Sequence, residues 1–171
     1  SVPGYVSGIR EIVSQCDGTF PFDDVVVAYG TGSTAAGLLA GLALADLGAT
    51  LHAVSISSVA AMARFGASSP DALVEAAVAH YGWPVDLAQA RCRCDWVRAA
   101  DEPGYGVATP ESEAALRRFA HDEGLLLDPT YTAKAAAAML RLARDGRLSR
   151  GRRVLFVHTG GLSTTAAGAE H

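Results

Sequence analysis

The residues best suited to chemistry lie in one short segment rich in glycine and hydroxyl groups, Gly30-Thr31-Gly32-Ser33-Thr34. The β-branched run Val25 to Val27 before it predicts a buried strand, and the apolar run Ala35 to Leu47 after it predicts a buried helix. Such a turn brings backbone amides, hydroxyl groups and a helix N-terminus to one point, and glycines let a ligand approach the backbone. The segment therefore predicts an anion site, with phosphate as the favoured anion.

The spacing within this segment differs from that of the common nucleotide-binding loops. The segment lacks the lysine of a Walker A loop, and Gly30-x-Gly32-x4-Gly37 is not the G-x-G-x-x-G of a dinucleotide fold. ATP and NAD are therefore disfavoured as ligands. The alternative is a tight strand-to-helix turn that binds nothing and is capped by Ser33 or Thr34.

Composition limits the class of protein. The length of 171 residues suits a single α/β unit, residues 1–171, and the net charge of −4 argues against nucleic acid or an anionic membrane as partner. The segment Val25 to Ala45 comes closest to a membrane span, but Gly, Ser and Thr interrupt it and favour a core segment. Cys16, Cys92 and Cys94 are too few and too irregular for a disulfide framework or a metal site, which favours reduced thiols in a cytoplasmic protein.

Strands and helices are predicted to alternate along the chain. A second strand, Thr50 to Ser57, would lie parallel to the first through the crossover helix and complete a βαβ unit. The other predicted elements are helices at Gly4–Gln15, Asp71–Tyr81 (capped by Ser69), Thr109–Asp122 and from the Asp128-Pro129 turn to Asp145, a short strand at Arg91–Val97 and a buried strand at Val154–Val157. This pattern predicts an α/β fold, an open, mostly parallel sheet with helices on both faces.

Two glycine-containing turns follow strands of this predicted sheet. Gly30 begins the turn after the first strand, and Thr159-Gly160-Gly161 follows the strand Val154 to Val157. Ligands of open α/β sheets bind outside the carboxyl ends of the strands. We therefore expect both turns to border the ligand site.

Four segments in matching order resemble a known enzyme family. They are Gly30-Thr-Gly-Ser-Thr-Ala-Ala-Gly-Leu, Pro103-Gly-Tyr-Gly-Val-x-x-Pro-Glu, Glu123-Gly-Leu-Leu-Leu-Asp-Pro-Thr-Tyr-Thr-Ala-Lys-Ala and Val154-Leu-Phe-Val-His-Thr-Gly-Gly. The chain resembles D-cysteine desulfhydrase and 1-aminocyclopropane-1-carboxylate (ACC) deaminase, of the fold-type II pyridoxal-phosphate enzymes. The resemblance runs from Gly4 to Gly161 but covers only about the carboxyl-terminal half of such an enzyme.

This resemblance implies pyridoxal 5'-phosphate as cofactor and gives roles to single residues. The loop that holds the cofactor phosphate is matched by Gly30, Thr31, Gly32, Ser33 and Thr34. Thr159 matches a hydroxyl that faces the pyridine nitrogen, where a neutral donor leaves the ring a weaker electron sink than a carboxylate would. Tyr105 and Tyr131 match two active-site tyrosines. The residues alone leave open the alternative that both tyrosines pack with satisfied hydroxyls.

Several departures from the family pattern bear on the substrate. ACC deaminases carry Glu after the tyrosine of the Asp-Pro-x-Tyr motif, where this chain has Thr132, and they lack the Thr of His-Thr-Gly-Gly. Both differences favour the desulfhydrase branch and make Thr132 a third candidate catalytic residue. The end reads Gly160-Gly-Leu-Ser-Thr-Thr instead of the family's usual Gly-Gly-Ala-Pro, and Tyr29 is bulkier than the small residue expected. These two departures point to a changed substrate.

Lys134 is the only lysine of the chain. A pyridoxal-phosphate enzyme needs a lysine to bind the cofactor aldehyde and usually to move the substrate proton. Lys134 matches a family lysine that does not form the Schiff base, and we expect it to be a cation at a helix end or between domains. The Schiff-base lysine belongs to the missing half. The resemblance therefore implies a second polypeptide that carries the amino-terminal half, and an oligomeric assembly.

Three classes of function remain open from the sequence. The first is a subunit of a pyridoxal-phosphate lyase that releases a keto acid and ammonia from a small amino acid by α,β-elimination, with ACC-deaminase-like ring opening as the alternative reaction. The second is a catalytically inactive binding or regulatory module that keeps the fold. The third is an unrelated α/β phosphate-binding protein. The first is favoured because the phosphate loop, both tyrosines and Thr159 occur together.

Overall fold

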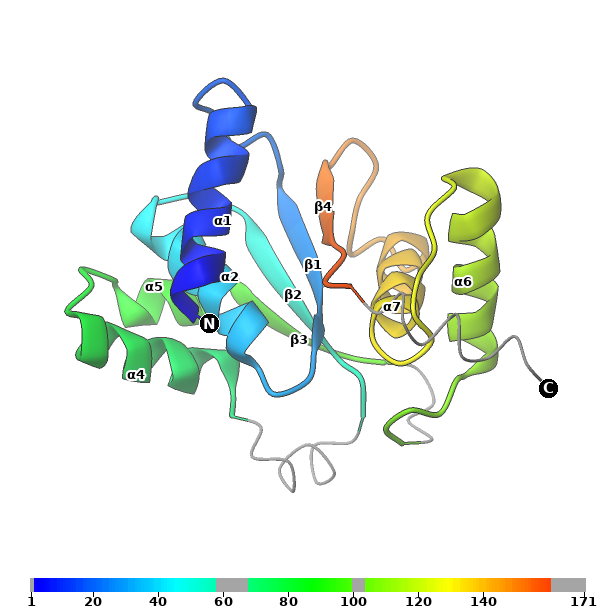
Figure 1. The fold of residues 1–171 in the computed structure, drawn as a ribbon. Coiled ribbons are helices and arrows are strands. Elements are labelled where there is room, and N and C mark those ends of the chain that lie inside the picture. The colour runs from blue at the N-terminus through cyan, green and yellow to red at the C-terminus, as the bar shows by residue number, and fades with distance from the viewer. Residues whose placement is uncertain (1, 58–67, 100–103, 161–171) are drawn as a thin grey trace.

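Parallel strands form the sheet of the described chain, which comprises residues 2–57, 68–99 and 104–160 of a computed structural model. In the order in which they lie, the strands are β3 (Cys94–Arg98), β2 (Thr50–Ser55), β1 (Asp24–Tyr29) and β4 (Val154–Val157). β1 pairs with β2 on one side and with β4 on the other, and every pairing is parallel (Figure 1). The carboxyl ends of all these strands therefore face the same edge of the sheet.

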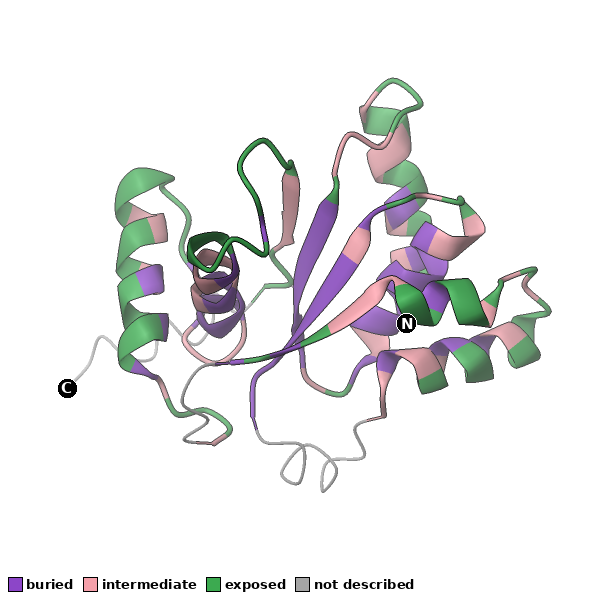
Figure 2. Cartoon of the chain, turned by 180° about the vertical axis from the view of Figure 1, so that it is seen from behind, coloured by how far each residue is buried: buried purple, intermediate pink, exposed green. Residues whose placement is uncertain are grey.

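Helices cover both faces of this sheet (Figure 1). One face carries α1 (Val2–Gln15), α2 (Ser33–Leu44), α4 (Pro70–Tyr81) and α5 (Leu87–Cys92), while α7 (Thr132–Arg144) covers the other and α6 (Pro110–Asp122) packs against α7. Val25 and Val27 of β1 pack into the first layer, and Val26 and Ala28 pack beneath α7. Both faces of β1 are therefore buried (Figure 2), as its unbroken β-branched run predicts. The α/β fold class with helices on both faces is confirmed.

Two glycines bring α1 directly against α2. A Cβ added at Gly37 would lie 2.6 Å from Tyr5 Cβ, and one added at Gly41 would lie 2.8 Å from Ile9 Cγ1. Only residues without a side chain permit this approach of the two backbones. The contact fixes Tyr5, near the amino end of α1, close to the first turn of α2.

Capping residues set the ends of α4 and α6, and the Ser69 cap of α4 is the one that the sequence predicts. The Ser69 side chain accepts a hydrogen bond from Ala72 N at the start of α4, and Gly82 ends that helix in the left-handed conformation. At the start of α6, Thr109 and Ser112 exchange side-chain to backbone hydrogen bonds in a capping box.

The helix α2 ends earlier than the sequence predicts. It stops at Leu44 instead of Leu47, because Asp46 takes a left-handed conformation (φ 47°) and the Leu47 N–H donates to Leu42 O. Gly48, the first residue after the predicted helix, has no such conformation.

The helix α5 is absent from the sequence-based prediction. Its six residues are too few for a periodic pattern, and Asp86 stabilises it by accepting hydrogen bonds from Ala88 N and Gln89 N. It takes up the first residues of the predicted strand Arg91–Val97, so that β3 begins at Cys94.

The strand β4 is half-buried, although its apolar sequence predicts a buried strand. It forms an edge of the described sheet, with β1 as its neighbour on one side. The residue Gly161 of the following turn and Pro103 of the second resemblance segment lie outside the described residues.

Several features of the described ranges concern the class of protein. None of their helices is long and apolar enough to cross a membrane. They contain no group of three or more His, Cys, Asp or Glu side chains that could hold a metal ion. Cys16, Cys92 and Cys94 are free thiols, and burial raises the pKa of Cys94 to about 12, with the charges of Asp71 and Asp95 adding to the effect.

Candidate active site

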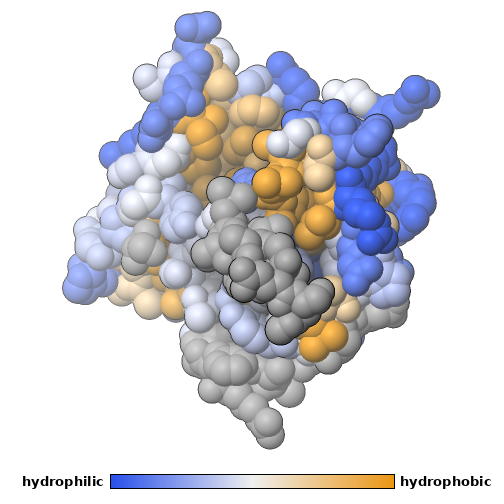
Figure 3. Space-filling model, turned by 45° about the vertical axis from the view of Figure 1, so that its right-hand side comes forward, coloured by the Kyte–Doolittle hydropathy of each residue, from blue (hydrophilic) through white to orange (hydrophobic). Residues whose placement is uncertain are grey.

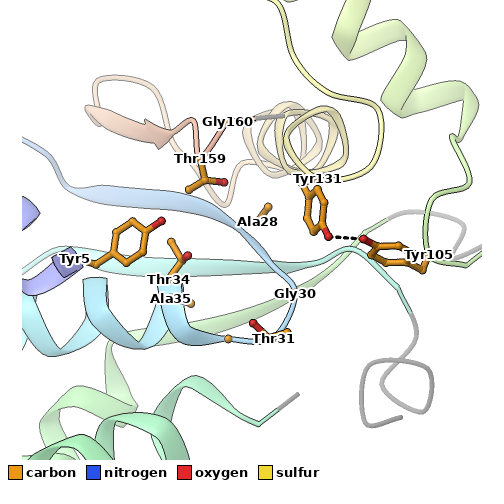
Figure 4. Close-up of a pocket in the computed structure, with 11 residues that line it drawn as sticks. Tyr5, Ala28, Gly30, Thr31, Thr34, Ala35, Tyr105, Tyr131, Thr159 and Gly160 are labelled. Atoms are coloured by element: carbon orange, nitrogen blue, oxygen red, sulfur yellow. Dashed lines mark hydrogen bonds between the residues drawn. The ribbon is translucent and has the colours of Figure 1, made fainter. Parts of the chain in front are cut away.

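A cavity of about 460 Å³ lies at the carboxyl ends of β1 and β4. Figure 4 shows that its side chains come from the amino end of α1, the β1–α2 turn, the loop before α6, the approach to α7 and the segment after β4. The lining residues are Tyr5, Ala28, Gly30, Thr31, Gly32, Thr34, Ala35, Tyr105, Tyr131, Thr159 and Gly160. Five parts of the chain that are separate in sequence therefore meet at one site, at the edge of the sheet where the sequence predicts it.

Seven of the nine candidate residues from the sequence line this cavity. They are Gly30, Thr31, Gly32, Thr34, Tyr105, Tyr131 and Thr159. Ser33 and Thr132 are not among the lining residues. The binding and catalytic roles of all nine stay predictions, because the geometry brings residues together without identifying what they bind.

Tyr5 is the lining residue with a functional group that sequence reasoning missed. Its position among the apolar residues of α1 indicates a core side chain, and its hydroxyl instead points toward the cavity near Thr34 and Thr159 (Figure 4). The available signal was its position near the helix end, where a tyrosine can bury its ring and keep its hydroxyl in a polar site.

The amino end of α2 is open toward the cavity. Gly32 occupies the N-cap position in the left-handed conformation (φ 99°), and no side chain caps the helix. The interpretation of Ser33 or Thr34 as a cap is therefore wrong. The first-turn N–H groups of a helix have no partner within the helix, and the helix dipole adds partial positive charge there. Unlike the ends of α4 and α6, this end has no side chain bound to its first amides, an arrangement that suits an anion.

The backbone behind this turn explains both Gly32 and the bulky Tyr29. A Cβ added at Gly32 would lie 2.7 Å from Ser68 O and 2.8 Å from Leu73 Cδ1. The hydroxyl of Tyr29 donates to the same Ser68 carbonyl, and its ring packs edge-on against Trp96 with 4.8 Å between centroids. Burial raises the pKa of Tyr29, and the charge of Asp71 adds to this effect. Tyr29 is thus a support behind the loop and does not line the cavity.

Tyr105 and Tyr131 form a pair at one side of the cavity (Figure 4). Their hydroxyl oxygens lie 2.5 Å apart, and their rings meet edge to face with centroids 5.9 Å apart. Burial, the hydrogen bond with Tyr105 and the charges of Tyr105 and Asp128 raise the pKa of Tyr131 to about 12. The Tyr131 hydroxyl is a neutral phenol at neutral pH, as an unshifted tyrosine would be, and the shift keeps it protonated to higher pH.

Asp128 fixes the turn that carries Tyr131. Its Oδ1 accepts hydrogen bonds from Thr130 N at 3.0 Å and Tyr131 N at 2.7 Å, and its Oδ2 accepts one from Thr132 N at 2.9 Å. The Thr132 hydroxyl is fully buried and donates to the same Oδ2 at 2.6 Å. The contacts of Thr132 are therefore those of a residue that shapes the start of α7, and its hydroxyl lies outside the cavity lining.

Comparisons with known proteins identify the family. A profile described as "Pyridoxal-phosphate dependent enzyme" matches residues 2–160. The chain belongs to this family. The family's cofactor is pyridoxal phosphate, as the sequence resemblance implies.

Relatives within the pyridoxal-phosphate family include both enzymes that the sequence resembles. The chain is 36% identical over 165 residues to a candidate ACC deaminase from Pyrococcus horikoshii, covering 95% of this chain and 46% of that protein. It is 35% identical over 160 residues to a D-cysteine desulfhydrase from Klebsiella pneumoniae, covering 92% and 46%. The crystal structure of an ACC deaminase homologue superimposes with a TM-score of 0.79 at 33% identity, covering 96% of this chain and 46% of that one. The chain thus spans about half the length of these relatives.

The cavity fits the phosphate end of the family's cofactor. Its volume lies within the range of about 300–1,000 Å³ found for small-molecule sites. The open end of α2 supplies unpaired amides, and Thr31 and Thr34 place hydroxyl groups beside them. Thr159 stands on the other side of the cavity, at the end of β4 (Figure 4).

Lys134, the only lysine of the chain, lies away from the cavity. It is absent from the cavity lining, and its Nζ donates to the carbonyls of Ile56 at 2.9 Å and Gly104 at 3.0 Å. The expectation of a cation at a helix end is correct in position, since Lys134 lies in the first turn of α7. The side chain is nevertheless buried within this chain, so it is not an exposed cation awaiting another domain.

Proposed function

We propose that this chain forms the phosphate- and substrate-binding part of a two-polypeptide pyridoxal-phosphate lyase. Its substrate is a small amino acid with a β leaving group, and the reaction is the α,β-elimination of a D-cysteine desulfhydrase. The observation that carries the proposal is a cavity that joins an open helix end, Thr159 and the tyrosine pair but contains no lysine.

The open end of α2 is the proposed phosphate site. The amides of Gly30 to Thr34 would donate to the phosphate oxygens, as expected for a helix N-terminus with no capping side chain. Ser33 takes part through its backbone N–H, since its side chain does not line the cavity. Thr31 and Thr34 add hydroxyl donors.

Pyridoxal phosphate, when bound, supplies the electron sink that makes the α-proton of an amino acid acidic. Thr159 would offer a neutral hydroxyl to the ring nitrogen of the cofactor, which would leave that nitrogen unprotonated. Tyr131 is a phenol at neutral pH and would donate a hydrogen bond to an anionic group of the substrate. Tyr105 orients the Tyr131 hydroxyl through the 2.5 Å hydrogen bond between them. Asp128 and Thr132 hold the turn that orients Tyr131.

A second polypeptide is proposed because the chain lacks a lysine in the cavity and spans 46% of its relatives. The half-buried β4 provides a surface for it. An apolar strand at a sheet edge presents unpaired backbone groups and apolar side chains, which stable proteins cover. Figure 3 shows hydrophobic residues gathered on this side of the molecule, and Leu125 and Leu126 are about half exposed.

Cyclopropane ring opening is the second candidate reaction. The identity to the Pyrococcus horikoshii protein (36%) is only one percentage point above that to the desulfhydrase (35%), so overall identity does not separate the two. Elimination is preferred because Thr132 stands where ACC deaminases carry Glu, and because the buried Thr132 hydroxyl already bonds Asp128.

The test is purification of the chain with the polypeptides that bind it in its source cells. Mass spectrometry should find a partner that carries a lysine bound to the cofactor, and the complex should eliminate D-cysteine or β-chloroalanine faster than it opens ACC. Tyr131→Phe should lower kcat at least about tenfold, whereas Tyr81→Phe, outside the cavity, should not.

The other outcomes separate the alternatives. Preferential turnover of ACC would replace elimination by ring opening. A cofactor-loaded complex without turnover would favour a binding or regulatory module. A monodisperse chain that eliminates β-chloroalanine alone would refute the two-chain proposal and return Lys134 to consideration as the Schiff-base residue.

A further inference from the structure

Lys134 is a buried cation held by backbone carbonyls. Its side chain is 2% exposed, in the first turn of α7. Burying an ammonium group is costly unless acceptors match its protons. The Lys134 Nζ donates to Ile56 O at 2.9 Å and to Gly104 O at 3.0 Å. These two contacts join segments that lie far apart in the sequence, around Ile56 and around Gly104.

The two carbonyls belong to segments that border the cavity. Ile56 directly follows β2, and its N–H donates to Tyr29 O at the end of β1, so it is part of the rigid edge of the sheet. Gly104 directly precedes Tyr105, whose side chain is 49% exposed on a loop. Lys134 therefore ties the loop that carries Tyr105 to the end of the sheet.

The same turn of α7 holds this loop a second time. Tyr131 and Lys134 are three residues apart at the start of the helix, where side chains at that spacing are neighbours. Tyr131 bonds the Tyr105 hydroxyl, and Lys134 bonds the carbonyl directly before Tyr105. One helical turn thus holds both the backbone and the side chain of the same segment.

We propose that Lys134 is a positioning residue for the tyrosine pair: its ammonium group holds the Gly104 carbonyl and thereby keeps the Tyr105 hydroxyl against that of Tyr131. The only lysine of the chain then aligns proton-carrying groups instead of binding the cofactor. This inference rests on the proposed role of the pair in the reaction. The attachment itself is measurable without cofactor, substrate or partner.

Loss of the attachment has a defined physical consequence. Tyr105 lies between Gly104 (φ 123°) and Gly106 (φ 76°), so its segment gains backbone freedom when the carbonyl is released. The hydrogen bond from Tyr105, which raises the pKa of Tyr131, is then formed for less of the time. Its phenolate population and its accessibility to reagents both rise.

Nitration with tetranitromethane, which attacks phenolates, tests this in the full chain. Peptide mass spectrometry measures the rate at each tyrosine. Tyr81 is 50% exposed and matches Tyr105 in exposure, while Tyr29 is 6% exposed and reports unfolding. Lys134→Met should raise the rates at Tyr105 and Tyr131 about fivefold relative to Tyr81, the factor that corresponds to one typical hydrogen bond. The rate at Tyr29 should not change.

Gly104→Ala is the second variant, because it disturbs the same attachment from the loop side. A Cβ at this position meets no atom within 4 Å, so only the positive φ is strained and α7 stays intact. Gly104→Ala should also raise the nitration rates at Tyr105 and Tyr131. It tests the inference by itself if Lys134→Met does not fold. The inference is overturned if neither variant raises the rates at the pair relative to Tyr81, or if both raise Tyr29 in step. If the chain nitrates as expected but its complex with the lysine-bearing polypeptide never turns over substrate, the proposed function is refuted and this inference stands.

Discussion

Replacing Gly32 by alanine tests the phosphate loop through two independent effects. Gly32 has a φ of 99°, where a residue with a Cβ is strained by about 1–2 kcal/mol. The new Cβ would also lie 2.7 Å from Ser68 O and 2.8 Å from Leu73 Cδ1. Overpacking of this kind costs about 1–3 kcal/mol. The sum is about 2–5 kcal/mol, which for a chain of this length lowers Tm by about 4–20 °C.

Two control variants separate the loop from general stability. Gly48→Ala meets no atom within 4 Å, so its unfolding free energy should stay within about 0.5 kcal/mol of the wild type. Gly37→Ala forces α1 away from α2, since its Cβ would lie 2.6 Å from Tyr5 Cβ, and it should destabilise by about 1–3 kcal/mol while it leaves the β1–α2 turn in place.

The assay combines thermal denaturation with calorimetric titration of pyridoxal phosphate at a temperature where all variants are folded. We expect Gly32→Ala to lose affinity more than tenfold and Gly37→Ala to lose much less at comparable stability. If Gly32→Ala has the same Tm as Gly48→Ala, the strain argument is wrong. If it is destabilised but binds the cofactor like the wild type, the amides at the end of α2 do not hold the phosphate.

Three further predictions concern single polar contacts. Asp128→Ala removes the acceptor of the α7 turn and should destabilise the fold by about 2–4 kcal/mol in urea denaturation, with Asp128→Asn intermediate. Burial alone would raise the pKa of Asp24, but hydrogen bonds and charges from Arg152 and His52 outweigh it and lower that pKa below 3.8. The stability from Asp24 is then fully present above pH 3.8 and lost as pH falls through the lowered pKa, so Asp24→Asn should flatten the acid limb of a urea-denaturation profile. Thr159→Val should keep the bound cofactor, measured by absorbance, and lower kcat of the assembled enzyme about tenfold.

The sequence was sufficient for elements whose signals are local. The β-branched run of β1 and the Ser69 cap each specify their structure within a few residues, and the structure has them there. The glycine turn was likewise predictable, because strand, glycines and apolar helix follow directly on one another. Its N-cap is the exception, since Ser33 is a good capping residue by type and the left-handed Gly32 excludes it from that position.

Features that depend on tertiary contacts were not predictable. The hydroxyl of Tyr5 enters the cavity only because Gly37 lets α1 lie on α2, and no pattern in α1 itself contains that contact. The position of the Thr132 hydroxyl was not predictable either, since it bonds Asp128 four residues earlier and does not line the cavity. The burial of Lys134 depends on Gly104 and Ile56, which the sequence separates widely.

The helices α2 and α7 both begin near the cavity, and their amino ends differ in whether a side chain already accepts hydrogen bonds from the first amides. At α7, the Asp128 carboxylate already accepts the first amides, so this end offers little to a second anion. At α2, no side chain takes that place. The Lys134 ammonium lies between two carbonyls, and Tyr131 is a neutral phenol. Among the groups at the cavity, the amino end of α2 is therefore the best suited to an anion such as one phosphate. The substrate carboxylate then depends on weaker hydroxyl donors here, and on donors that the proposed second polypeptide would bring.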